Sequence, residues 1–126
     1  MAFLPKFRAY YGAEMYDEPV IHNGDFYLDW RDFIDGNTYD DAVLMQSTGL
    51  LDKNGKEIFE NDIVEWEHKD TEQLVRGIVK YDTGLGFWGM TDVRFNDLTA
   101  IGYLANQRVT VLGNIYENPE LVEVKE

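Results

Sequence analysis

The chain contains no cysteine, and this absence excludes two kinds of structure. There is no disulfide framework and no thiolate ligand for a metal. Histidine is scarce as well, because only His22 and His68 are present to activate a nucleophile, and no Gly-x-Ser-x-Gly motif occurs. Both histidines are expected to face solvent or lie at a rim. The sequence therefore predicts a protein that is not an enzyme.

Motifs for cofactors and metals are also missing. Thr83-Gly84-Leu85-Gly86 has two glycines but lacks the rest of a phosphate-binding fingerprint, so it predicts a turn. Asp52-x-Asn54-Gly55 begins like a calcium loop, but its glycine is at the wrong position and Ile63 stands where the loop needs glutamate. Glu57, Glu60 and Asp62 are expected to cap turns or face solvent instead of holding a cation. We expect no cofactor and no metal.

Long apolar runs are absent too. No segment approaches the roughly 20 apolar residues that cross a bilayer. No basic and then apolar leader opens the chain. These features predict a soluble, intracellular protein.

Positive charge is the next shortage, with 11 Lys and Arg residues against 24 Asp and Glu and a net charge of −13. Nucleic-acid binding depends on Lys and Arg that neutralise phosphates. Here the basic residues are scattered and form no stripe. We therefore expect no direct contact with nucleic acid or with an anionic membrane, which leaves basic proteins as partners.

Turn signals and alternating apolar residues dominate the 126 residues, a length that suits one domain with a real core. They predict an all-β chain with short helical turns. Asn118 and Pro119 are typical of the start of a short helical turn, while residues 96–106 fit either a helical turn or an irregular connection. The expected strands cover residues 6–11, 20–22, 26–28, 43–46, 63–68, 74–81, 87–94 and 109–116.

The stretch from Leu44 to Val64 holds the densest turn signals. Asn54-Gly55 predicts a two-residue type I′ hairpin, in which both residues need a positive φ. Asn61 is expected in a left-handed conformation within a second turn. In the strand that follows, Val64 and Trp66 are predicted on one side, with glutamates on the other.

Three segments resemble the YopX family of small bacteriophage and prophage proteins: LMQSTGLLDKNGKEIFENDIV, VLGNIYENPELVE and the opening KFRAY. The resemblance implies a mostly β protein in the host bacterial cytoplasm. It implies an N-terminal β extension over residues 1–43 and an SH3-like, partly closed barrel over residues 44–118. Asn61 departs from the family, which usually has glycine there. The resemblance implies no activity.

Residues 14–41 carry nine acidic side chains and one arginine. Within them, Phe26, Trp30, Phe33 and Ile34 have helical spacing, which competes with a hairpin around Asn23-Gly24. We favour the hairpin as far as Leu28, followed by a short helical turn over residues 30–33.

This acidic and aromatic run contains the candidate interaction surface. Its functional interpretation is a docking surface for a host or phage protein, and the simpler alternative is a solvated acidic edge over a small local core. Two further hypotheses are an acidic mimic of nucleic acid that inhibits a host DNA-binding enzyme, and a small domain that binds a metal or metabolite. Self-association stays open. The candidate residues are Asp25, Asp29, Trp30, Asp32, Phe33 and Asp35.

Overall fold

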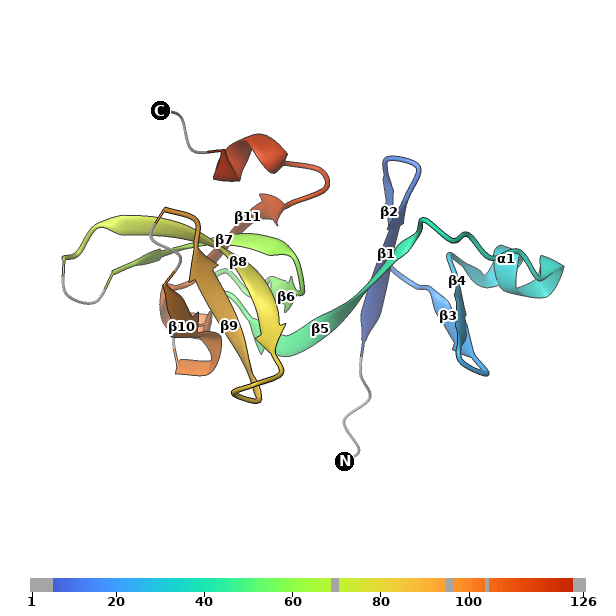
Figure 1. Cartoon of the computed structure of the whole chain (residues 1–126), viewed down its shortest axis with the longest axis horizontal. Helices are drawn as coiled ribbons and strands as arrows, with labels where there is room; N and C mark the ends of the chain where they lie inside the picture. The colour runs from blue at the N-terminus through green and yellow to red at the C-terminus, as the bar shows by residue number, and fades with distance from the viewer. Residues whose placement is uncertain (1–5, 69–70, 95–96, 104, 124–126) are drawn as a thin grey trace. The chain divides into compact units, whose positions relative to one another are not determined.

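The computed structural model describes residues 6–68, 71–94, 97–103 and 105–123, and it is built mostly of short antiparallel strands (Figure 1). The prediction of a β-rich chain with short helical turns is therefore confirmed. The chain forms two compact units, Met1–Ser47 and Thr48–Glu126. The boundary between the units falls inside strand β5 (Val43–Leu51).

In the first unit, β1 (Phe7–Tyr11) is the centre of a small sheet. It pairs with β2 (Glu14–Tyr16) on one side and with the first residues of β5 on the other, where Ala9 lies opposite Leu44. β2 was not predicted, because three residues carry too little periodicity to mark a strand. Ala9 and Met45 are fully buried in this sheet.

The second part of this unit is a hairpin followed by a helix. β3 (Val20–His22) and β4 (Asp25–Tyr27) join through Asn23-Gly24, where both residues have a positive φ, as the hairpin prediction requires. Helix α1 (Trp30–Asp35) follows and ends at Gly36, whose φ is 73°. The predicted order of hairpin and short helical turn is confirmed.

The second unit contains a five-stranded antiparallel sheet in the order β10-β9-β8-β7-β11. The sheet curls strongly (Figure 1), which is consistent with the SH3-like barrel that the resemblance implies. For residues 96–106 the sequence allowed either a helical turn or an irregular connection. The described part of this segment holds β10, η1 and α2. The bounds are β6 (Glu57–Phe59), β7 (Asp62–Glu67), β8 (Leu74–Asp82), β9 (Phe87–Asp92), β10 (Leu98–Ala100), η1 (Ile101–Tyr103), α2 (Ala105–Arg108), β11 (Thr110–Asn114) and η2 (Pro119–Val122).

The concave face of this sheet carries the core of the second unit. β8 is its middle strand, as its mixed apolar faces predict, and Val79 on β8 lies opposite Met90 on β9. Val64 and Trp66 of β7 are buried, whereas Glu67 is exposed, so the predicted alternation is confirmed. The cluster is made of Ile58, Val64, Trp66, Val79, Met90, Ile101, Ala105 and Val109.

The loop between β5 and β6 corrects one prediction. Only Gly55 has a positive φ there, 82°, so the loop is not a type I′ turn. The Gly55 N–H donates to the Asp52 carbonyl over 3.0 Å, and the Asp52 N–H donates to the Lys56 carbonyl over 2.7 Å. This pattern is a longer hairpin loop that ends with a left-handed glycine. The prediction failed because it ignored the side chain of Asp52.

The Asp52 carboxylate is buried and organises this loop. Oδ1 accepts hydrogen bonds from the N–H groups of Asn54 (2.9 Å) and Lys56 (2.8 Å), and Oδ2 accepts one from Val111 of β11 (2.9 Å). Burial alone would raise the pKa of Asp52, but these backbone donors and the nearby Lys56 charge outweigh it. The pKa of Asp52 is therefore lowered below its ordinary value of 3.8.

Polar side chains hold other turns in the same way. Asn61 has the predicted left-handed conformation, with a φ of 70°. Next to it, Asp62 Oδ2 accepts a bond from the Phe59 N–H over 2.8 Å, as expected for a turn cap. η2 begins after Asn118 as predicted, but the Asn118 side chain accepts from the Asn114 N–H instead of capping the helix.

We predict that Asp52→Asn lowers the free energy of unfolding by about 2–4 kcal/mol, because an amide cannot accept all three backbone bonds. Folding lowers the pKa of Asp52, so its stabilising contribution is present above pH 3.8 and is lost as the pH falls through the folded-state pKa. Urea unfolding between pH 7 and pH 2 measures both effects. The exposed Asp40→Asn is the control, and equal stability of the two variants would contradict the role of Asp52.

Gly77→Ala tests the close approach of β8 to the core. A methyl group at Gly77 would lie 2.7 Å from the Thr91 carbonyl oxygen and 2.8 Å from the Trp66 ring. We expect a loss of about 1–3 kcal/mol in urea unfolding. Gly102→Ala is the matched control, since a methyl group there meets no heavy atom within 4 Å. A loss of the same size at both positions would show that glycine replacement itself, and not the Trp66 contact, is responsible.

Candidate functional site

Helix α1 carries most of the predicted interaction residues, and local interactions hold both of its ends. The Asp29 side chain caps its start by accepting a hydrogen bond from the Asp32 N–H over 2.8 Å. The left-handed Gly36 closes its end by donating to the carbonyls of Asp32 and Phe33. Asp25 belongs to β4 and therefore lies on the hairpin, not on the helix.

Phe33 attaches α1 to the hairpin. Its ring lies 5.2 Å from the ring of Tyr27 and 5.5 Å from that of His22, both edge to face. The indole of Trp30 lies 5.3 Å from Phe33 on the other side. Phe33 is half-buried in these contacts, and His22 is otherwise exposed, as expected. Phe33 therefore supports the helix from within the unit.

Trp30 and Ile34 are the apolar side chains that α1 presents to solvent. They stand one helical turn apart, and 63% of Trp30 and 66% of Ile34 is exposed. Together with Asp29 and Arg31 they line an open hollow of about 510 Å³. We call the exposed surface of Trp30 and Ile34, together with the carboxylates of Asp29, Asp32 and Asp35 on the same helix and its N-cap, the α1 face.

The carboxylates of the α1 face differ in their exposure and in their hydrogen bonds within the protein. Asp35 is exposed, whereas Asp32 is half-buried and accepts a hydrogen bond from the Tyr39 hydroxyl over 3.3 Å. Desolvation and the charge of Asp32 raise the pKa of Tyr39. Desolvation and the charge of Glu14 raise the pKa of Tyr16, to which Asp29 and Asp32 add smaller effects. The region is strongly negative.

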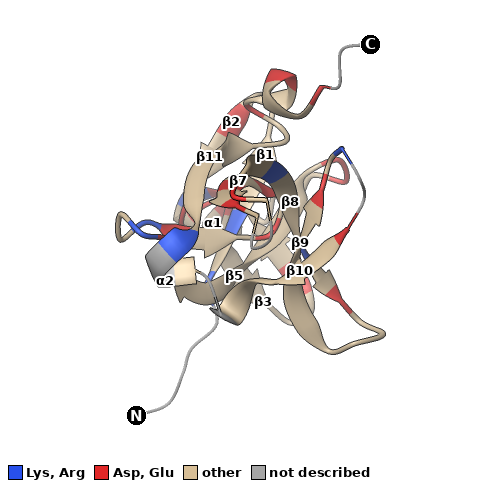
Figure 2. Ribbon diagram, turned by 90° about the vertical axis from the view of Figure 1, so that its left-hand side faces the viewer, with Lys and Arg blue, Asp and Glu red and all other residues tan. Residues whose placement is uncertain are grey.

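The acidic residues of this unit are not confined to α1. Asp and Glu lie on β2, the hairpin, α1 and the loops between them, and Arg31 is the one Lys or Arg of residues 14–41. Over the whole chain, Asp and Glu outnumber Lys and Arg, which Figure 2 colours red and blue. Of the nine acids, Asp29 and Asp32 make the internal hydrogen bonds described above. The acids therefore do not form a regular row on one element.

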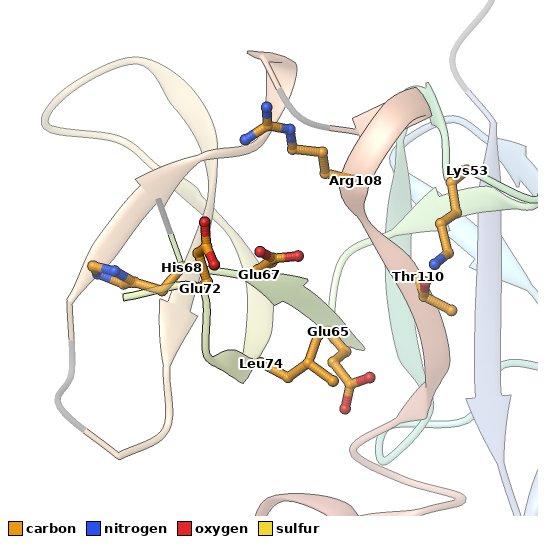
Figure 3. A pocket seen from close by; sticks show the side chains of 8 residues that line it. All are labelled: Lys53, Glu65, Glu67, His68, Glu72, Leu74, Arg108 and Thr110. Atoms are coloured by element: carbon orange, nitrogen blue, oxygen red, sulfur yellow. The ribbon is translucent and has the colours of Figure 1, made fainter. Parts of the chain in front are cut away.

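The second unit has a cleft that the sequence did not predict. Figure 3 shows it beside β7, with Glu67 and Glu72 on one side and Lys53 and Thr110 on the other, while Arg108 reaches over it. Its volume is about 460 Å³. His68, Leu74 and Glu65 complete its lining, and we call this space the charged cleft.

One carboxylate of the charged cleft is already neutralised. Glu65 forms an ion pair of 3.2 Å with Arg76, and Arg76 also donates to the Leu121 carbonyl over 3.2 Å. Among residues 6–68, 71–94, 97–103 and 105–123, no group of three or more His, Asp or Glu side chains converges on a metal position. The cleft presents charges of both signs.

Sequence reasoning missed the charged cleft for a clear reason. Its basic residues, Lys53 and Arg108, are 55 positions apart, and each taken alone is an ordinary surface residue. The hydrogen bond from the Lys53 N–H to the Val109 carbonyl joins the two segments, and the pairing of β11 with β7 places Thr110 opposite Glu65. No local motif carries that information.

In the part of the chain that the structure describes, no helix has the length and apolar character needed to cross a membrane.

A family model and one solved structure carry the same family name. The family model described as YopX protein matches residues 6–123. The crystal structure of protein EF1440 from Enterococcus faecalis is 30% identical, with a TM-score of 0.61, and the match covers 97% of this chain and 100% of that one. The structure of protein yopX from Bacillus subtilis is 26% identical, with a TM-score of 0.62, covering 94% and 98%. None of the curated proteins matches the chain.

Asp29→Ala tests the cap of α1. The change removes the acceptor of the Asp32 N–H, so we expect a loss of about 0.5–2 kcal/mol in helix stability. Amide hydrogen exchange at residues 32–36 should become faster. Asp35→Ala is the control, because it removes an exposed carboxylate from the same helix without removing the cap. Unchanged exchange in Asp29→Ala would contradict the capping role.

Proposed function

The chain belongs to the YopX protein family, and from that premise we propose that it is a non-enzymatic phage or prophage protein that binds a basic protein partner through the α1 face. The observation that carries the proposal is the exposure of Trp30 and Ile34 on one side of a helix that is surrounded by carboxylates. The partner's matching surface is an apolar side chain flanked by Lys or Arg.

The apolar part of the α1 face supplies affinity in this proposal. Tryptophan is among the residues that dominate binding energy at protein interfaces, because a large rigid ring buries much area. Burying a large apolar side chain stabilises a complex by about 1.5–3 kcal/mol. Trp30 already rests on Phe33, so its ring loses less freedom on binding than an isolated side chain would.

The acidic part of the α1 face makes binding selective for cationic partners and raises the association rate. Asp29, Asp32 and Asp35 belong to the same helix and its N-cap as the apolar pair, and Arg31 is the basic residue among them. Carboxylates at an interface rim attract cationic partners and raise the association rate, and salt screens this effect. We therefore expect binding to weaken as salt rises, without being lost entirely, since the apolar contact is not screened.

The nucleic-acid mimic is the competing hypothesis for the same negative charge. A mimic relies on carboxylates at phosphate-like spacing and has no need of an exposed indole. The acids of the first unit lie on several elements, and Asp29 and Asp32 are engaged locally. The α1 face supports protein docking better for this reason.

The test is capture of partners from a lysate of the bacterium that carries the gene, followed by affinity measurement with the purified partner. Trp30→Ala and Ile34→Ala should each weaken binding by tenfold or more, equivalent to about 1.4 kcal/mol. Ile21→Ala is the matched control, because Ile21 is also an exposed apolar residue of the first unit, on strand β3. The control should bind like the wild type.

The outcomes separate the hypotheses. A basic partner lost in Trp30→Ala supports docking through the α1 face. A nucleic-acid enzyme that is retained by Trp30→Ala and released by moderate salt alone would favour the mimic. Absence of any specific partner at low and at moderate salt, or equal weakening by Ile21→Ala, would overturn the proposal.

A further inference from the structure

We infer that the charged cleft binds a small zwitterion, a molecule of the amino-acid class that carries one carboxylate and one amine. The inference does not depend on the α1 face. Its basis is that one cleft presents cationic and anionic side chains, and that backbone hydrogen bonds hold the segments that carry them.

The cationic wall consists of Lys53 and Arg108. The Lys53 N–H donates to the Val109 carbonyl over 2.9 Å, and the loop that carries Lys53 is held by the buried Asp52. Arg108 ends helix α2, directly before the fully buried Val109. Thr110 lines the same cleft (Figure 3), so two cations and a hydroxyl are available for a carboxylate.

The anionic wall consists of Glu67 and Glu72. Glu67 is the last residue of β7 and pairs with Leu74 of β8. The loop between these strands is closed by the His68 N–H donating to the Gln73 carbonyl (2.8 Å) and the Glu72 N–H donating to the His68 carbonyl (2.9 Å). Figure 3 shows the two carboxylates on the same side of the cleft, where they are available for an ammonium group.

These opposite charges do not neutralise one another. Among the described residues, Lys53, Arg108, Glu67 and Glu72 form no ion pair within 4.0 Å, and Glu65 is paired with Arg76. Each wall is therefore free to take an ionic group of the opposite sign.

The size and polarity of the cleft narrow the class of ligand. Its volume of about 460 Å³ lies within the range of small-molecule sites, and its lining is mostly polar and charged. A ligand with one charge would pair with the side chains of one wall only. A zwitterion engages both, and its second contact forms within the complex at a high effective concentration.

The experiment is calorimetric titration of the full chain with glycine, 4-aminobutyrate and 6-aminohexanoate, which carry the same two charges at increasing separation. Butyrate and butylamine are the singly charged probes. We expect at least one zwitterion to bind tenfold or more tightly than either singly charged probe. Arg108→Gln and Glu67→Gln should each weaken that binding by tenfold or more.

Lys80→Gln is the matched control, because Lys80 is an exposed cation of β8 that does not line the cleft. It should bind like the wild type, and unchanged melting temperatures should show that all three variants fold. Three results would overturn the inference: no binding of any zwitterion at 10 mM, butyrate or butylamine binding as tightly as the zwitterions, or binding unaffected by both cleft variants. Partner capture by the α1 face should stay intact in Arg108→Gln, so the two proposals fail separately.

Discussion

A single buried carboxylate connects the beginning of the second unit to its last strand. Asp52 accepts two backbone N–H groups within its own loop and one from Val111, which is 59 positions further along the chain. The loop is therefore bonded both to itself and to β11, which also pairs with β7. Lys53, on one wall of the charged cleft, depends directly on this connection.

The same physical solution recurs wherever the chain turns sharply. Short strands bury little apolar area each, so the turns must be held by hydrogen bonds to backbone groups that would otherwise lack a partner. In the turn that leads into β7, Asp62 accepts a hydrogen bond from a backbone N–H, and Asp29 does the same at the start of α1. After β11, Asn114 accepts from the N–H groups of Tyr116 and Glu117. Part of the acidic surplus thus serves the fold.

The remaining acids give the two units different chemical characters. On the α1 face, an exposed Trp and Ile share a short helix with carboxylates, which suits a cationic and apolar protein surface. In the charged cleft, carboxylates face Lys53 and Arg108, which suits a small ligand with both charges. A net charge of −13 does not distinguish these cases, because it sums turn caps, rim charges and cleft charges alike.

The sequence by itself determined the features that rest on local backbone preferences. Asn23-Gly24, the left-handed Asn61, the short helix at Trp30 and the alternation along β7 were all predicted, because turn torsions and side-chain period act over a few residues. Only the tertiary structure decided the loop at Asn54 and the position of the cleft. There the deciding contacts are the hydrogen bonds of Asp52 with Val111 and of Lys53 with Val109, which join segments far apart in the chain.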